Sequence, residues 1–106
     1  RARMLEAELR DERRAPFFTG TRVIESARAA RTRGIDVILL DDRGTSGGLT
    51  DDTQKAIINQ AARALDDARQ GQVVIRLLPP RQRPRLLSIV TDNNILTLDA
   101  DGVLVR

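Results

Sequence analysis

The sequence predicts an α+β fold: a two-layer sandwich of helices on a mixed, mostly antiparallel sheet. Before Gly71, three segments carry apolar residues at helical spacing, and one strand-like run lies among them. After Gly71 the chain consists of short strand-like runs separated by turn residues. Helices gathered early and hairpins gathered late are typical of a sheet with helices packed on one side.

Two helices are expected first. Residues 1–14 form a polar helix that ends before Pro16, and residues 15–20 form a short linker. The helix could pack on the domain or on a second copy, or continue an upstream helix, because its apolar stripe is thin. The chain opens on Arg, so we expect it to be part of a longer protein. Residues 21–33 form the second helix, which Gly34 stops. The thin stripe consists of Met4, Leu5 and Leu9.

The next two elements are a strand and a long helix. Residues 35–42 (IDVILLDD) switch to the apolar run of a strand that is buried on at least one face. Residues 51–70 have the strongest helical pattern in the chain. Asp51 and Gln54 have capping-box spacing, and Gly71 follows the last turn. The expected buried face consists of Ile57, Ile58, Ala61, Ala62, Leu65 and Ala68.

The remaining chain is expected to supply the antiparallel strands. Residues 72–78 and 85–91 are strand-like, and the proline-rich loop at 79–84 between them suits neither a helix nor a central strand. Residues 95–98 form a short strand, and residues 103–105 add a final edge strand. Turns are expected at 92–94 and 99–102, where Asp, Asn and Gly gather.

The amino-acid composition excludes several classes of functional site. The chain has 106 residues, which allows one domain, and it contains no Cys, His, Trp or Tyr. The lack of Cys removes disulfide frameworks and thiolate zinc sites. The lack of His removes histidine-based catalytic triads and any phosphohistidine acceptor in this segment. We therefore assign no catalytic residue and no metal ligand.

The charge pattern favours a salt-bridged surface over a nucleic-acid interface. The net charge is +3 with a pI of about 10.9, and 18 basic residues are interspersed with 15 acidic ones along the chain. The chain has only two aromatic residues, too few for a base-stacking platform. Nucleic-acid binding would require four arginines to share one face: Arg76, Arg81, Arg83 and Arg85. No apolar run is long enough to form a helix that spans a membrane, so we expect no membrane contact by this segment.

Several polar segments could carry chemistry, although each also has a purely structural interpretation. The loop at 43–49 (RGTSGGL) is either a strand-to-helix connection or a phosphate cradle. Lys55, the sole lysine, is either an exposed residue or a sign of a nearby anion. The three acidic turns suit solvated strand ends and hairpins as well as cation binding. They contain Asp41 and Asp42, then Asp92, and finally Asp99 and Asp101 before Gly102.

The chain from Gly34 onward resembles the ATP-binding domain of sensor histidine kinases, in the GHKL superfamily. GIDVILLDD (34–42) is similar to the first strand of that domain, and LTDDTQKAIINQAARALDDA (49–68) is similar to its N-box helix. QVVIRLL (72–78) and RLLSIVTDNN (85–94) are similar to the next two strands. The resemblance implies a histidine-kinase ATPase-like fold, with Asp92 at the position of the adenine-reading Asp.

The positions that carry the family's chemistry are mostly altered. The acidic residue and the magnesium-binding Asn of the N box correspond to Gln60 and Ala64, and Ala64 cannot ligate a metal. The glycines after Asp92 correspond to Asn94 and Leu96, where Asn tolerates a left-handed turn and Leu would crowd a nucleotide. The resemblance thus implies a degenerate or truncated member that binds ATP weakly, without a magnesium site, through Asp92, Asn94 and Gln60.

Two functions remain open from the sequence. The first is a cytoplasmic signal-transduction module of a two-component system that has no kinase activity of its own. It would act by weak nucleotide binding or by contacts with a signalling protein, and it could be the cytosolic part of a longer membrane-bound sensor. The second is a non-enzymatic, homodimeric α+β interaction module. For both functions we expect the same domain division, with a helix at 1–15 and an incomplete α+β domain at 16–106. An open, partly apolar cleft between the 51–70 helix and Asp92 would favour the first.

Overall fold

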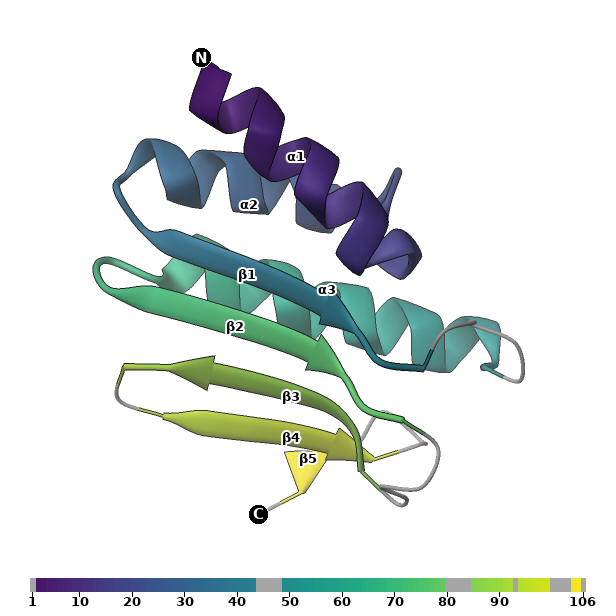
Figure 1. Ribbon diagram of the computed structural model, residues 1–106. Helices are drawn as coiled ribbons and strands as arrows, with labels where there is room; N and C mark the ends of the chain where they lie inside the picture. The colour runs from purple at the N-terminus through teal and green to yellow at the C-terminus, as the bar shows by residue number, and fades with distance from the viewer. Residues whose placement is uncertain (1, 44–48, 80–84, 93, 100–103, 106) are drawn as a thin grey trace.

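The computed structural model describes residues 2–43, 49–79, 85–92, 94–99 and 104–105, and within these ranges it has the predicted α+β architecture. Helices pack on one face of a mixed, mostly antiparallel sheet (Figure 1). The elements are α1 (Ala2–Arg14), the short 3-10 helix η1 (Pro16–Phe18), α2 (Arg22–Thr32), β1 (Asp36–Asp41), α3 (Asp51–Asp67), β2 (Gln72–Leu77), β3 (Arg85–Thr91), β4 (Ile95–Asp99) and β5 (Leu104–Val105).

The sheet has the strand order β1-β2-β3-β4-β5. β1 and β2 are parallel and are joined through α3, because parallel neighbours need a crossover connection. β3, β4 and β5 continue the sheet as antiparallel neighbours, as their sequence spacing predicts. In this register Val73 faces Thr91 and Ile89 faces Leu96.

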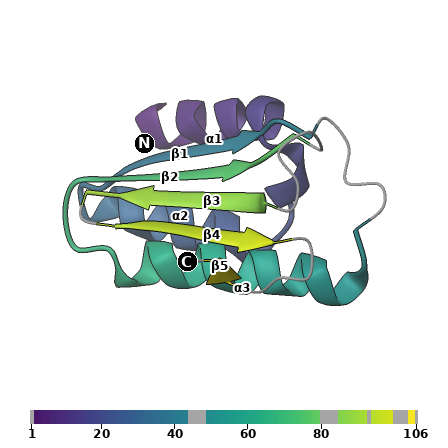
Figure 2. The same ribbon diagram turned by 90° about the horizontal axis from the view of Figure 1, so that it is seen from below.

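The core lies between the sheet and the two helices α2 and α3. α3 packs against β2 and β3, and α2 lies beside α3 and contacts β1 (Figure 2). Alternate strand residues point into this layer, as the period of a strand requires. The helices contribute Val23, Ala27, Ala30, Ile57, Ala61, Ala62 and Leu65, and the strands contribute Val37, Leu39, Val73, Ile75, Leu77, Leu87, Ile89 and Leu98.

The other face of the sheet, nearest the viewer in Figure 1, has no helix over β3 and β4 among the described residues. Val90 and its partner Ile95 point to this side, and they are 37% and 68% exposed. The sandwich therefore has one filled layer and one open apolar strip.

The predicted linker at 15–20 is partly a structural element. Pro16 opens the 3-10 helix η1, and the side chains of Ala15 and Phe18 are fully buried in the core. The ring of Phe18 meets that of Phe17 edge to face, with centroids 5.1 Å apart. The interpretation as a simple linker was wrong because an apolar side chain in a short turn can still reach the core.

The ends of α3 differ from the prediction. Thr50, not Asp51, is the N-cap: its Oγ1 accepts a hydrogen bond from the Thr53 N–H at 3.1 Å. The helix ends at Asp67 instead of residue 70. Arg33 caps this end, since its Nη2 donates to the carbonyl oxygens of Leu65 and Ala68 at 2.7 and 3.1 Å.

Some predicted features lie outside the described residues. They are the turn residues 44–48, the proline-rich residues 80–84, the turn residues 100–102, and the side chains of Met4 and Leu5. Of the four arginines considered for nucleic acid, the side chains of Arg81, Arg83 and Arg85 also lie outside this set. Arg76 is described, and its guanidinium pairs with Asp42.

Candidate functional site

A cleft of about 500 Å³ opens between the C-terminal half of α3 and the β3–β4 hairpin. It exists because α2 and α3 cover only part of the sheet, so the inner side of β4 is reached from solvent beside α3. Its lining consists of Gln60, Arg63, Ala64, Asp67, Ala68, Arg69, Gln70, Val73, Ile89, Thr91, Asp92, Asn94 and Leu96.

The cleft has apolar walls and a polar rim. Gln60 and Ala64 are four residues apart on α3, so they line one side of the helix, and Ala68, its C-cap, continues this lining. The opposite wall is formed by the cross-strand pair Ile89 and Leu96. The short side chains of the two alanines keep the space between helix and sheet open. The arrangement suits a flat apolar group that carries hydrogen-bonding edges.

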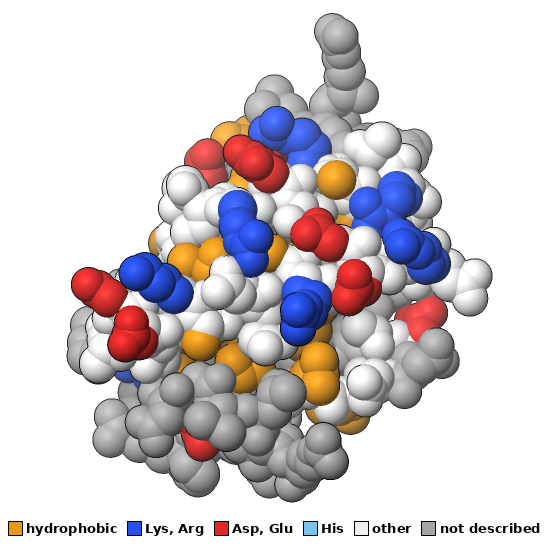
Figure 3. All heavy atoms as spheres, turned by 180° about the vertical axis from the view of Figure 1, so that it is seen from behind, with side chains coloured by type: hydrophobic (Ala, Val, Ile, Leu, Met, Phe, Trp, Pro, Cys, Tyr) orange, Lys and Arg blue, Asp and Glu red, His pale blue; other side chains and the backbone are white. Residues whose placement is uncertain are grey.

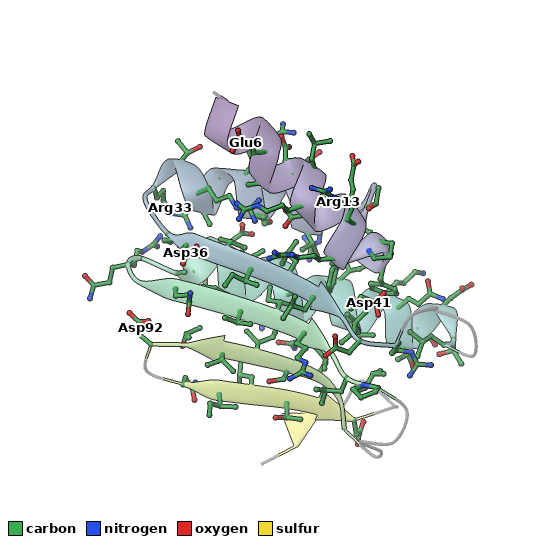
Figure 4. The ribbon with its side chains drawn as sticks, viewed as in Figure 1. Glu6, Arg13, Arg33, Asp36, Asp41 and Asp92 are labelled. Carbon is green, nitrogen blue, oxygen red and sulfur yellow. The ribbon has the colours of Figure 1, made fainter. Side chains whose placement is uncertain are left out.

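Asp92 lies at the rim, directly after β3 (Figure 4). Its Oδ1 accepts a hydrogen bond from the Gln72 N–H at 3.2 Å. The carboxylate also lies over Gly71, where a Cβ atom would be 1.7 Å from Asp92 Oδ2. Gly71 has φ +86°, so it supplies both a left-handed turn and the space for Asp92. The sequence interpretation treated Gly71 only as a helix stop and missed this contact.

Asn94 closes the β3–β4 turn. Its carbonyl oxygen accepts from the Thr91 N–H at 2.9 Å, and its Oδ1 accepts from the Ile95 N–H at 2.9 Å. No described residue other than glycine has a positive φ, so Asn94 does not adopt the left-handed conformation for which it was considered. Its contribution to the rim of the cleft is its side-chain amide.

A second, more polar hollow of about 610 Å³ lies on the outer side of α3. Gln60, Arg63 and Asp67 border both hollows, so they form a ridge between them. Arg22 at the start of α2 reaches this hollow, and its Nη2 donates to Asn59 Oδ1 at 2.6 Å. Figure 3 shows the helix-covered face, on which basic and acidic side chains are interspersed.

The acidic turns do not converge. Asp92 lies at one end of the sheet with Asp36, and Asp41 lies at the opposite end (Figure 4). Asp41 Oδ1 accepts from the Arg43 N–H at 3.0 Å, as expected for a strand-end turn. Within the described ranges, no three acidic side chains group closely enough to hold a metal ion. Lys55 lies on the exposed side of α3 and lines neither hollow.

The three candidate site residues from the sequence therefore share one cleft. Gln60 comes from α3, whereas Asp92 and Asn94 come from the β3–β4 turn. Ala64 and Leu96, the altered positions beside them, line the same cleft. Among the described helices, none is both long and apolar enough to cross a membrane. In comparisons with known protein families, with curated proteins and with solved structures, the chain has no significant match.

Proposed function

We propose that this chain is a signal-transduction module that binds an adenine nucleotide in the cleft between α3 and the β3–β4 hairpin, and that it transfers no phosphoryl group itself. The observation that carries the proposal is the cleft, which gathers Gln60, Asp92 and Asn94 at an apolar floor. These are the positions at which the resemblance to histidine-kinase ATP-binding domains implies nucleotide contacts. The proposed location is the cytoplasm, where such a nucleotide is available.

The apolar walls of the cleft suit the flat faces of a purine ring, and its polar rim suits the hydrogen-bonding edge of the ring. A flat ring would lie between Ala64 and Ala68 on one side and Ile89 and Leu96 on the other. The Asp92 carboxylate would accept a hydrogen bond from the exocyclic amine, because an ionised carboxylate is an acceptor only. Its orientation is set beforehand by the Gln72 N–H.

The phosphates would run along the ridge on the C-terminal half of α3. Arg63 lies on this ridge and makes no ion pair within the described part of the chain. A guanidinium binds phosphate without a metal ion. Phosphoryl transfer would also need a nucleophile, and the chain has no histidine to accept the group. The proposal is therefore nucleotide binding that is indifferent to magnesium.

Calorimetric titration with a non-hydrolysable ATP analogue tests this function. We expect weak binding, in the micromolar to millimolar range, with the same affinity in the presence and absence of magnesium. Asp92→Ala should lower the affinity about 10- to 100-fold, the cost of losing a hydrogen bond to a charged group. A lack of heat with millimolar analogue would overturn the proposal.

Asp36→Ala is the matched control. Asp36 lies at the same end of the sheet and also bonds to Gln72, accepting from its Nε2 at 2.9 Å, but it does not line the cleft. Its replacement should leave the affinity unchanged. An equal loss in the Asp36 and Asp92 variants would assign the effect to the Gln72 turn and not to a nucleotide contact.

The open strip on the other face of the sheet supports the second candidate function, a homodimeric interaction module. Val90 and Ile95 are large apolar residues that are exposed side by side. An apolar pair of this kind is a common component of protein interfaces. Sedimentation would then show the mass of a monomer at low protein concentration and that of a dimer at high concentration. This result, together with no heat on addition of nucleotide, would favour this function over the first.

A further inference from the structure

The outer edge of β1 is the free edge of the sheet on the N-terminal side. The N–H groups of Asp36 and Asp42 donate to the carbonyl oxygens of Gly71 and Leu77 on the β2 side. Because backbone groups alternate along a strand, those of Val37, Leu39 and Asp41 point away from β2. The carbonyl oxygen of Val37 confirms this direction, since it accepts from Arg31 Nη2 at 2.8 Å.

Helix α1 covers this edge. It lies beside β1 in both ribbon views (Figures 1 and 2) and is joined to the edge through one ion pair. Asp11 accepts two hydrogen bonds from Arg31, at 2.8 and 3.1 Å, and Arg31 in turn holds the Val37 carbonyl. Both charged side chains are nearly buried, with 5% of Asp11 and 12% of Arg31 exposed.

Few of the α1 side chains that the structure describes hold the helix in place. Its buried side chains in the described part are Ala7 and Asp11, and the buried Ala15 follows its last turn. Leu9 points away and is 47% exposed. The apolar area that these described side chains bury is therefore small, and burial of an ion pair is offset by the cost of removing both charges from water. Among the described contacts, the attachment of α1 depends on ion pairs that water can replace.

We propose that α1 is a releasable guard of the β1 edge. It undocks as a unit while the two-layer core stays folded, and it thereby uncovers the backbone N–H groups of Val37, Leu39 and Asp41, while Arg31 of α2 keeps the Val37 carbonyl. The chain after Ala15 is fixed by the buried Phe18, so the hinge lies at Ala15 and Pro16. The uncovered groups are those with which an extended segment adds a strand to a sheet. Docked α1 keeps that edge closed.

Native-state hydrogen exchange followed by NMR tests the guard without any substitution. In the unaltered chain, the amides of α1 and those of Val37, Leu39 and Asp41 should share one opening constant. This constant should exceed that of the core amides in β2 and β3 by at least about tenfold, because local opening requires less free energy than global unfolding. Exchange of α1 only together with β2 and β3 would overturn the proposal.

Two substitutions at equivalent positions sharpen the test. Asp11→Ala leaves the nearly buried Arg31 without its carboxylate partner, so the shared opening constant should rise about 100-fold while β2 and β3 keep their protection. Glu8→Ala is the matched control. Glu8 joins α1 to α2 one turn earlier, accepting from Arg28 Nε at 2.9 Å, and its hydrogen bond and charge raise the pKa of the Arg28 guanidinium. Arg28 is 56% exposed, so this change should raise the constant no more than about fivefold.

The pair of variants separates the guard from a general loss of stability. A uniform loss of protection in Asp11→Ala, in β2 and β3 as much as in α1 and β1, would show that α1 is an integral part of the core. Equal effects of Asp11→Ala and Glu8→Ala would show that the buried pair has no special part in docking. If Asp11→Ala does not fold, the exchange hierarchy of the unaltered chain decides the question alone.

Discussion

Replacement of Phe18 by alanine is expected to lower the free energy of unfolding by about 3–5 kcal/mol. The side chain is fully buried and is among the largest in the core, so its loss removes apolar contacts and leaves a cavity between the helices and the sheet. A domain of this size has a total stability of about 5–15 kcal/mol, so the variant should be close to unfolding at 37 °C. Urea unfolding monitored by circular dichroism measures the change.

Phe17→Ala is the control for Phe18→Ala. The two rings are adjacent and in contact, but Phe17 is only partly buried against the core. Its truncation should cost less than half as much, because solvent already reaches part of the ring and no enclosed cavity forms. Equal losses in the two variants would contradict the assignment of Phe18 as the anchor of the turn.

Replacement of Gly71 by alanine should affect both stability and the candidate site. Alanine at φ +86° costs about 1–2 kcal/mol, and its Cβ would collide with the Asp92 carboxylate. Asp92 must then turn away and give up its hydrogen bond from the Gln72 N–H. We expect the stability to fall by about 2–3 kcal/mol, the sum of the backbone cost and one hydrogen bond. Nucleotide affinity should fall as far as it does in Asp92→Ala.

Gly34→Ala separates the two causes. Gly34 connects α2 to β1 as Gly71 connects α3 to β2, and its φ is +90°, but a Cβ atom there would meet no atom within 4 Å. The variant should show the backbone cost alone and retain its nucleotide affinity. Urea unfolding and the calorimetric titration, performed on both variants, give the difference that belongs to Asp92. Loss of binding in Gly34→Ala would contradict this division.

The strands were predictable because each has a local cause. β3 occupies residues 85–91 as predicted: proline precedes it, a polar turn follows it, and apolar residues predominate within it. The parallel crossover through α3 and the helical layer follow from element order and the apolar side of each helix. The limits of the strands and the apolar side of each helix depend on neighbouring residues, so the sequence contains their signals directly.

The remaining features depend on residues far apart in the chain. The end of α3 is capped by Arg33, which lies before the helix in sequence and meets its last carbonyl groups only in the folded state. The burial of Asp11 depends on Arg31 in another helix, and a charged residue in a polar helix gives no sign of such a partner. Gln60, Asp92 and Asn94 were brought together by the family resemblance alone, because composition and spacing do not place a helix beside a hairpin.

The parallel pairing of β1 with β2 has a consequence for the order of folding. Val90 and Ile95 are close neighbours in the chain, whereas Asp36 and Gln72 meet only after the whole α3 crossover has been traversed. Closing a longer loop costs more entropy, so local pairs form earlier. We expect the β3–β4 hairpin to nucleate the sheet and β1 to join it late. Pulse-labelled refolding in which β1 amides gain protection before those of β3 would contradict this order. Until β1 pairs with β2, the backbone groups on that edge of β2 remain unpaired. Misfolding would then begin when this edge of β2 pairs with a strand of a neighbouring molecule.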